Sequence, residues 1–263
     1  MIKRIIGKRR IDLSHSAIQT IMNHRSIRKF KDKKLTEEQI QTIVEAAQMA
    51  STSSYVMAYT IIGVTDERIK EKLAAISGQS YVQNNGHLFV FCGDLHRTEQ
   101  LGSQEDREQM QQSLASPEQF IVMTVDAALA SQNAAIAAED LGLGICYLGS
   151  LRNDVYQVSE LLQLPERVVP LFGMAVGYPD HEPEQKPRLP IDVIYHENHY
   201  QPFEHQLPFI KDFDKQLHSY YEKRKQNNRN DNWSKQMIRK FSIPTRMDVG
   251  SFLHEKNINK QLD

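Results

Sequence analysis

The sequence is poor in cysteine, and this excludes several kinds of site. Its 263 residues include only two cysteines, Cys92 and Cys146, which form neither a CxxC redox motif nor a metal-binding pair. The ten histidines form no HxxxH or HExxH pattern. We therefore expect no metal site. We expect both thiols to be buried core residues, because free cysteine behaves as a small hydrophobe.

An excess of one charge and a long uninterrupted apolar run are also missing. The chain has 32 Lys and Arg against 33 Asp and Glu, so nothing suggests nucleic acid or an anionic membrane as a partner. Its basic N-terminus lacks the apolar core of a signal peptide, and we expect residues 1–15 to fray. The most apolar region, residues 120–143, contains Asp126 and Glu139, which argues against a membrane span. We expect a cytoplasmic protein.

Apolar residues at helical and strand spacings predict helices that alternate with strands. Thr36 and Gln39 form a capping-box pattern before a helix that should end near Ala50. Asp66 is a good N-cap and Gly78 a good C-cap for the next helix. The other expected elements are strands at 59–64, 87–93 and 168–176, a polar helical or loop excursion at 95–116, and a helix after Asp154.

A long alanine-rich helix is expected at the centre of the fold. Pro117 suits its first turn, and residues 120–141 are apolar nearly all round, as in a buried helix. The helix is also a candidate for a subunit interface. The glycines of residues 142–150 follow a helix and lead into a strand, which reverses the order of a Rossmann motif. This argues against a classical NAD-binding domain.

The composition changes after about residue 180. Prolines from Pro183 to Pro208 disfavour a long helix before about Ile210, and amphipathic helices are expected at 211–224, 232–240 and 247–255. We expect no second independent core there. The prediction is a single domain over residues 1–263, of the α+β class with three layers, in which residues 185–263 form an arm over the domain and a partner subunit.

Two basic clusters can each hold an anion. Arg25 and Arg28 lie three residues apart, and the planar arginine fork suits a phosphate or the edge of a heterocycle. Lys186 and Arg188 flank Pro187, and alternate side chains of an extended chain point the same way. Either cluster can equally be a solvated basic turn, and the hydroxyl-rich stretch 51–54 can be a plain loop.

Six stretches occur in a characteristic order: residues 24–30, 50–54, 78–81, 142–150, 186–190 and 227–234. Together they resemble the FMN-dependent nitroreductase superfamily, specifically its NADPH-linked nitroreductase and flavin reductase branch. The resemblance runs from about Ile18 to about Leu253. It implies a three-layer α-β-α nitroreductase-like fold with a mixed central sheet around a buried helix. It also implies FMN as the cofactor and NADPH as the hydride donor.

The resemblance further implies the residues of the site. Arg25, Lys186 and Arg188 would grip the FMN phosphate, and Arg28 would stabilise negative charge at the N1–O2 edge of the flavin. Ser150 stands where the family has a second glycine, and only a positive φ would require glycine there. The implied cofactor-binding set is His24, Arg25, Ser26, Arg28, Ser51, Thr52, Ser53, Gln79, Tyr81, Tyr147, Leu148, Gly149, Ser150, Lys186 and Arg188, with Arg229 and Arg246 for NADPH.

The implied activity needs no catalytic side chain, because hydride transfer takes place at flavin N5 while Arg28 tunes the flavin. The chain shows no Ser/His/Asp or Cys/His arrangement. Nitroaromatics, quinones or free flavin would accept electrons by a ping-pong mechanism in a homodimer, with FMN at the subunit interface and Ser51–Ser53 reaching the partner's flavin. Two alternatives stay open: a flavin-binding module, either sensor or store, with little turnover, and a helical interaction protein.

Overall fold

The computed structural model of the protein describes residues 16–224 and 228–260. The chain divides into two compact units, one of Met1–Pro183 with Asp248–Asp263 and one of Glu184–Met247. The second unit is therefore inserted into the sequence of the first. The segment expected to fray, residues 1–15, and Asn227 of the stretch 227–234 lie outside the described residues. The prediction of one domain over the whole chain stays a prediction.

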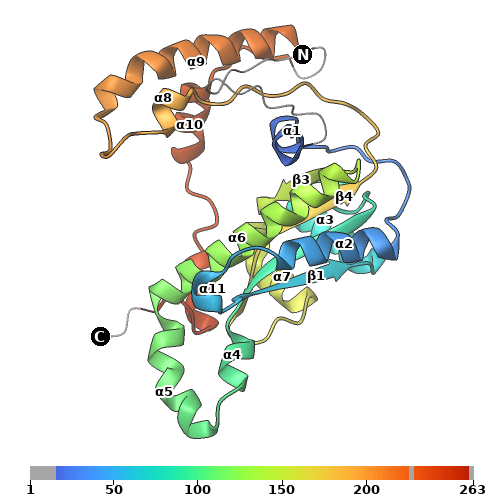
Figure 1. The fold of residues 1–263 in the computed structure, drawn as a ribbon, viewed down its shortest axis with the longest axis vertical. Coiled ribbons are helices and arrows are strands. Elements are labelled where there is room, and N and C mark those ends of the chain that lie inside the picture. The colour runs from blue at the N-terminus through green and yellow to red at the C-terminus, as the bar shows by residue number, and fades with distance from the viewer. Residues whose placement is uncertain (1–15, 225–227, 261–263) are drawn as a thin grey trace. The chain divides into compact units, whose positions relative to one another are not determined.

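The first unit is built on a four-stranded sheet (Figure 1). Its strands lie in the order β1-β2-β4-β3, and all three pairings are antiparallel. An isolated parallel bridge joins Ser26 to Ile145 of β3, so the sheet is mixed only through this bridge among the described residues. The bounds are β1 (Tyr59–Val64), β2 (His87–Asp94), β3 (Gly144–Leu148) and β4 (Val168–Gly177).

Helices are the other major component of this unit. Those expected from the sequence are present, and the polar excursion at 95–116 is helical. The helices are α1 (Ala17–Met22), α2 (Glu37–Gln48), α3 (Glu67–Ser77), α4 (His96–Gln100), α5 (Gln104–Ala115), α6 (Pro117–Asp140), α7 (Val155–Leu161) and α11 (Val249–Glu255), with 3-10 turns η1 (Ser53–Tyr55), η2 (Ser80–Val82) and η3 (Gly149–Asp154).

Helices cover both faces of the sheet. Alternate residues of β2 point to opposite faces, so their contacts show what covers each face. Phe89 and Phe91 pack in one apolar cluster with residues of α2 and α6. Leu88 and Val90 pack in another cluster with residues of α3 and α7. The three-layer α+β arrangement predicted from the sequence is confirmed, and Figure 1 shows α2 and α6 over the sheet.

Capping residues set the ends of α2 and α3 at the positions that the sequence predicts. The Thr36 hydroxyl accepts a hydrogen bond from the Gln39 amide at 3.2 Å, and the Gln39 side chain accepts one from the Thr36 amide at 3.1 Å. This is the expected capping box of α2. The Asp66 carboxylate caps α3, and Gly78 closes that helix in the left-handed conformation at φ 66°.

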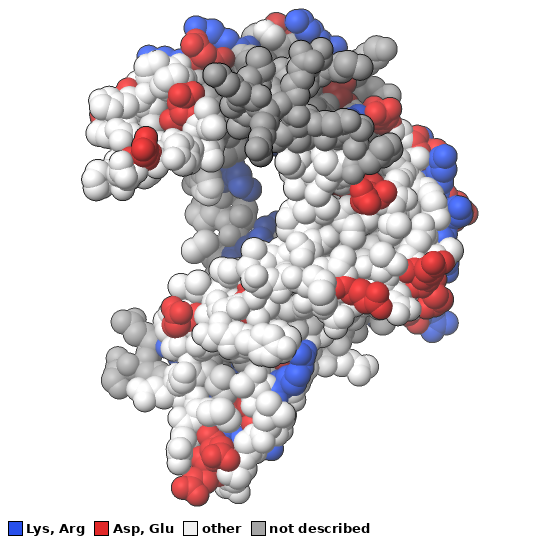
Figure 2. Space-filling view, viewed as in Figure 1, with Lys and Arg blue, Asp and Glu red and all other residues white. Residues whose placement is uncertain are grey.

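The long helix α6 is the central helix of this unit. Among the described helices it alone has the length and composition to cross a membrane. Its small residues Ala130, Ala134 and Ala138 are buried against the sheet, so the fold core accounts for the apolar character of this face. The opposite face is not buried as the sequence suggested, because Ile121, Val125 and Leu129 are exposed. The surface over α6 carries few charged side chains (Figure 2).

The second unit contains α8 (Ile191–Ile194), α9 (Phe203–Lys223) and α10 (Trp233–Phe241). The prediction that prolines prevent a long helix before about Ile210 is wrong, because α9 begins at Phe203 and continues through Pro208. The helix gives up a backbone hydrogen bond there. In return, its buried residues form one apolar-facing stripe on both sides of the proline: Gln206, Ile210, Phe213, Leu217 and Tyr221.

A small apolar cluster lies within the second unit. Phe213, Leu217 and Tyr221 are buried there, with Leu189 and Trp233 packed against them. The helices α10 and α11 agree with the expected spans 232–240 and 247–255.

Both cysteines are buried without a disulfide, as expected. Burial raises the pKa of Cys92 to about 12 and also raises the pKa of Cys146. Neither thiol is therefore a ready nucleophile at neutral pH.

We predict that His87 makes the protein acid-sensitive. His87 is buried with no hydrogen-bond partner for Nε2, and burial together with the nearby charge of Lys70 lowers its pKa to about 4. The unfolded chain, with a histidine pKa of about 6.5, binds the proton more readily. The free energy of unfolding should therefore be unaffected above about pH 6.5 and fall by up to about 3 kcal/mol as the pH drops to about 4.

Urea unfolding across this pH range is the measurement, with His87→Gln as the comparison. The variant cannot titrate, so its stability should depend less steeply on pH. An equal slope in both proteins would assign the acid sensitivity to other groups.

Candidate functional site

The segment from His24 to Arg28 is anchored at its centre to β3. The Ile27 amide donates to the Ile145 carbonyl at 2.8 Å, and the Ile27 side chain is buried. Gly144 permits this close approach, because a Cβ there would lie 2.5 Å from Cγ1 of Ile27. The anchor holds the two arginines of the motif in place on either side of Ile27.

Arg28 meets a second segment of the predicted site. Its guanidinium hydrogen-bonds the hydroxyl of Tyr81, which also bonds the thiol of Cys146. Burial raises the pKa of Tyr81, the Cys146 thiol raises it further, and Arg28 opposes this shift. Three segments distant in sequence are thus joined by one polar chain.

A pair of hydroxyls joins the same region a second time. Oγ of Ser77, at the end of α3, lies 2.6 Å from Oγ of Ser150 in η3. Gln79 follows this helix end directly, and Gly149 precedes Ser150. Ser150 is not among the residues with positive φ, so serine replaces the family's glycine without backbone strain.

Two predicted site residues direct their side chains into the core. The Tyr147 hydroxyl donates to the Ser131 carbonyl of α6 at 2.8 Å, and Leu148 is buried. Of these two residues, the backbone is therefore the part that can meet a ligand.

The loop that carries Ser51, Thr52 and Ser53 is held by a buried carboxylate. Asp126 of α6 accepts hydrogen bonds from the amide of Ser53 at 2.9 Å and from the amide of Ala58 at 3.0 Å. Between these anchors the backbone is left-handed at Ser54, Tyr55 and Met57, a conformation that persists only where the surroundings impose it. This role of Asp126 was not predictable from the sequence, where its only signal is a charge in an apolar helix.

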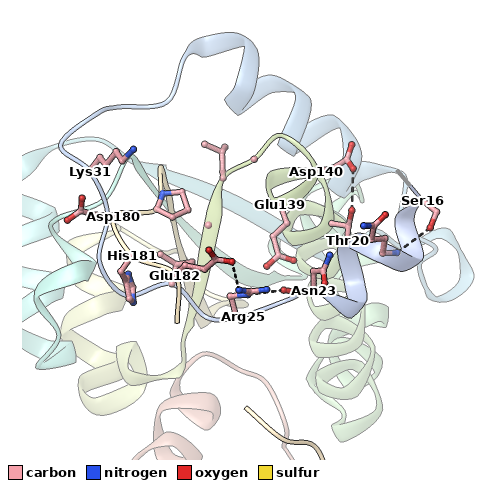
Figure 3. Close-up of a pocket in the computed structure, with 16 residues that line it drawn as sticks. Ser16, Thr20, Asn23, Arg25, Lys31, Glu139, Asp140, Asp180, His181 and Glu182 are labelled. Carbon is pink, nitrogen blue, oxygen red and sulfur yellow. Dashed lines mark hydrogen bonds and ion pairs between the residues drawn. The ribbon is translucent and has the colours of Figure 1, made fainter. Parts of the chain in front are cut away.

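Arg25 lines a pocket of about 770 Å³ (Figure 3). Arg25 Nη1 lies 2.7 Å from Glu182 Oε1, and Arg25 Nε donates to the Asn23 carbonyl at 3.3 Å. His24 Nδ1 lies 2.7 Å from Glu139 Oε1. Both basic residues at the start of the motif are therefore paired with carboxylates.

In the second unit, two predicted ligands lie over one buried tyrosine. Lys186 Nζ is 5.7 Å and Arg229 Cζ is 4.1 Å from the centre of the Tyr221 ring. Burial acts to raise the pKa of Tyr221, but the bonds from Lys186 and Arg229 outweigh it, and the pKa is lowered. Arg188 donates to the Lys186 carbonyl at 2.7 Å. Tyr221 carried no signal in the sequence.

Arg246 lies between α10 and α11 with φ 57°. The predicted convergence of Arg25 with Lys186 and Arg188 on one phosphate is a contact between the two units, and it stays a prediction.

Known proteins resemble this chain over nearly its whole length. The model of the nitroreductase family matches residues 21–178, and that of the nitroreductase family C-terminal domain matches residues 186–261. The FMN reductase (NADPH) of Bacillus subtilis is 47% identical over 251 residues, which cover 94% of this chain and 99% of that protein.

Solved structures agree. NfrA1 of B. megaterium superposes with a TM-score of 0.90 at 49% identity and covers 93% of this chain and 99% of that one. The NADPH:FMN oxidoreductase from Vibrio harveyi, complexed with NAD+, superposes with a TM-score of 0.83 at 37% identity and covers 93% and 99%.

We predict that Asp126→Asn loosens the loop of residues 51–58. An asparagine oxygen replaces only one carboxylate oxygen, and its NH2 group would face the second amide donor. The free energy of unfolding should fall by about 1–3 kcal/mol. Amide hydrogen exchange of residues 51–58 should accelerate.

The matched control is Asp140→Asn, at the exposed end of the same helix, where the carboxylate bonds only the Thr20 hydroxyl at 3.3 Å among the contacts described. Equal effects of the two substitutions would contradict the role given to Asp126.

Proposed function

The chain belongs to the nitroreductase family, and we propose that it is an FMN-dependent oxidoreductase that takes hydride from NADPH and reduces nitroaromatics, quinones or free flavin. The observation that carries this proposal is 47% identity, over 94% of the chain, with a protein named FMN reductase (NADPH). The cluster of Arg28, Tyr81 and the Ser77–Ser150 pair supports it, because it gathers the segments assigned to the flavin.

The residues present fit FMN in their chemistry. The guanidinium groups of Arg25 and Arg188 and the ammonium group of Lys186 suit a phosphate dianion. The hydroxyl of Ser26 and the anchored amides of the 51–53 loop suit a polyol chain. Neutral or acidic residues in place of Arg25, Lys186 and Arg188 would not suit a phosphate dianion.

Bound FMN would supply the hydride chemistry, and the chain would orient and tune it. Arg28 brings a permanent positive charge, and the Tyr81 hydroxyl holds that guanidinium in place. A fixed cation stabilises negative charge without reorganising during the reaction. We therefore assign to Arg28 the stabilisation of charge at the flavin edge, and we assign no proton transfer to a side chain.

Arg229 and Arg246 are the proposed contacts for the 2′-phosphate of NADPH. Arg229 is fixed by the Tyr221 ring and by a 2.9 Å hydrogen bond to Gln236 Oε1, so its guanidinium is partly pre-oriented. NADPH and the electron acceptor would bind in turn at the same site beside the flavin, which is the proposed basis of ping-pong kinetics.

The proposal is tested by purifying the protein, recording its visible spectrum and titrating it with NADPH under argon. We expect a flavin spectrum that is bleached by NADPH and restored by an added quinone over many cycles. A single bleaching without turnover would favour a flavin-binding module. A colourless protein that takes up no FMN would overturn both.

We predict that Arg229→Ala changes the choice of donor. Loss of a charge-assisted contact to the 2′-phosphate should lower kcat/KM for NADPH by about tenfold and leave that for NADH nearly unchanged. Steady-state kinetics with both donors is the measurement. Arg239→Ala is the control, because Arg239 is an arginine of the same unit that pairs with Asp231 at 2.9 Å. Equal losses for both donors would remove Arg229 from the site.

We propose that the protein is a homodimer with FMN at the interface. On α6, Ile121, Val125 and Leu129 recur at every fourth position and are 57%, 42% and 44% exposed, which makes an apolar stripe on one helix face. The surface there carries few charges (Figure 2). The same helix anchors the 51–53 loop through Asp126, so pairing along α6 would present that loop to a second copy.

We predict that Leu129→Glu separates the subunits. A carboxylate on the stripe must be desolvated in the dimer. The apparent mass in sedimentation velocity should halve, and FMN should be lost. Leu101→Glu is the matched control, since Leu101 is a leucine outside α6 that is 84% exposed. A dimer that survives Leu129→Glu and retains FMN would place the interface elsewhere.

A further inference from the structure

Arg25, assigned to the FMN phosphate, already holds an anion of the chain itself. Its Nη1 lies 2.7 Å from Glu182 Oε1, and Figure 3 shows the Glu182 carboxylate directed at the guanidinium. A carboxylate and a phosphate oxygen compete for the same forked donors. Glu182 therefore engages a donor of Arg25 that a phosphate would use.

The two partners are unequally exposed. The side chain of Arg25 is 26% exposed and that of Glu182 is 81% exposed. The carboxylate can therefore leave for water at small cost, whereas the guanidinium stays in the pocket. An exposed ion pair of this kind is weak, and a dianion can displace it.

The other carboxylates of the pocket are engaged elsewhere. Glu139 pairs with His24 at 2.7 Å, and Asp180 pairs with Lys29 at 3.1 Å. Asp140 accepts from the Thr20 hydroxyl at 3.3 Å. Competition for Arg25 is thus a property of one residue rather than of the acidic lining as a whole.

Glu182 lies close in sequence to the boundary between the two units. The first segment of the first unit ends at Pro183, and Lys186 follows four residues after Glu182. The backbone just before is fixed by a bond from the Asp180 amide to the Lys29 carbonyl at 3.0 Å.

We propose that Glu182 is an internal competitor of the FMN phosphate, which holds Arg25 when no phosphate is bound and lowers the affinity for FMN. This inference rests on the proposed function, since it takes FMN as the ligand. A carboxylate in this role lets the cofactor exchange more readily than the basic residues alone would allow.

The experiment compares FMN with riboflavin, which lacks the phosphate, by fluorescence titration of protein stripped of flavin. Glu182→Gln should bind FMN about two- to fivefold more tightly, the range that an exposed ion pair can contribute. Its affinity for riboflavin should not change. Asp180→Asn removes the same charge two residues away and should leave both affinities close to those of the unmodified protein.

Arg25→Gln separates the possible failures. If it weakens FMN binding but Glu182→Gln does not tighten it, Arg25 is a phosphate ligand and the competition is overturned. If Asp180→Asn tightens FMN binding as much as Glu182→Gln, the effect is general charge and the competition is again overturned. A protein that binds neither FMN nor riboflavin would overturn the proposed function itself.

Discussion

The pairing of Ile27 with Ile145 is the contact on which the candidate site depends. One buried side chain and one 2.8 Å backbone hydrogen bond fasten an otherwise polar, charged segment to the edge of β3. Because Ile27 is fixed, Arg25 is directed into the acidic pocket, whereas Arg28 reaches the Tyr81 hydroxyl. Two arginines of one short motif therefore meet different partners and take different roles.

Because the second unit is inserted into the sequence of the first, the chain must rejoin the first unit at Asp248. The segment that follows is held by a buried arginine, Arg167. Arg167 donates to Glu99 at 3.0 Å and to the Asn257 carbonyl at 2.7 Å, and it also bonds Gln111. A guanidinium buried to this degree is tolerated only when its donors are satisfied. The polar excursion of α4 and α5 thereby becomes a support for the C-terminal segment.

Much of the fold was predictable because its signals are local. The capping box at Thr36, the left-handed Gly78 and the apolar run of β2 each act within a few residues. The expected helix at 211–224 is present within α9, but the start of α9 at Phe203 was not predictable, because the local cost of Pro208 is outweighed by packing along the whole helix. For the site, the family resemblance indicated which segments to examine, but it did not reveal the groups that orient them.

By itself, the sequence determined the element order, the three-layer arrangement and the family, since these follow from periodicity, caps and ordered motifs. Only the tertiary structure decided that Asp126 anchors the 51–53 loop and that Glu182 pairs with Arg25. It also decided that the cationic groups of Lys186 and Arg229 lie over the Tyr221 ring. The physical reason is the same in each case. A charge finds its partner through space, and residues separated by 73 or 157 positions give no sign in the sequence that they will be neighbours.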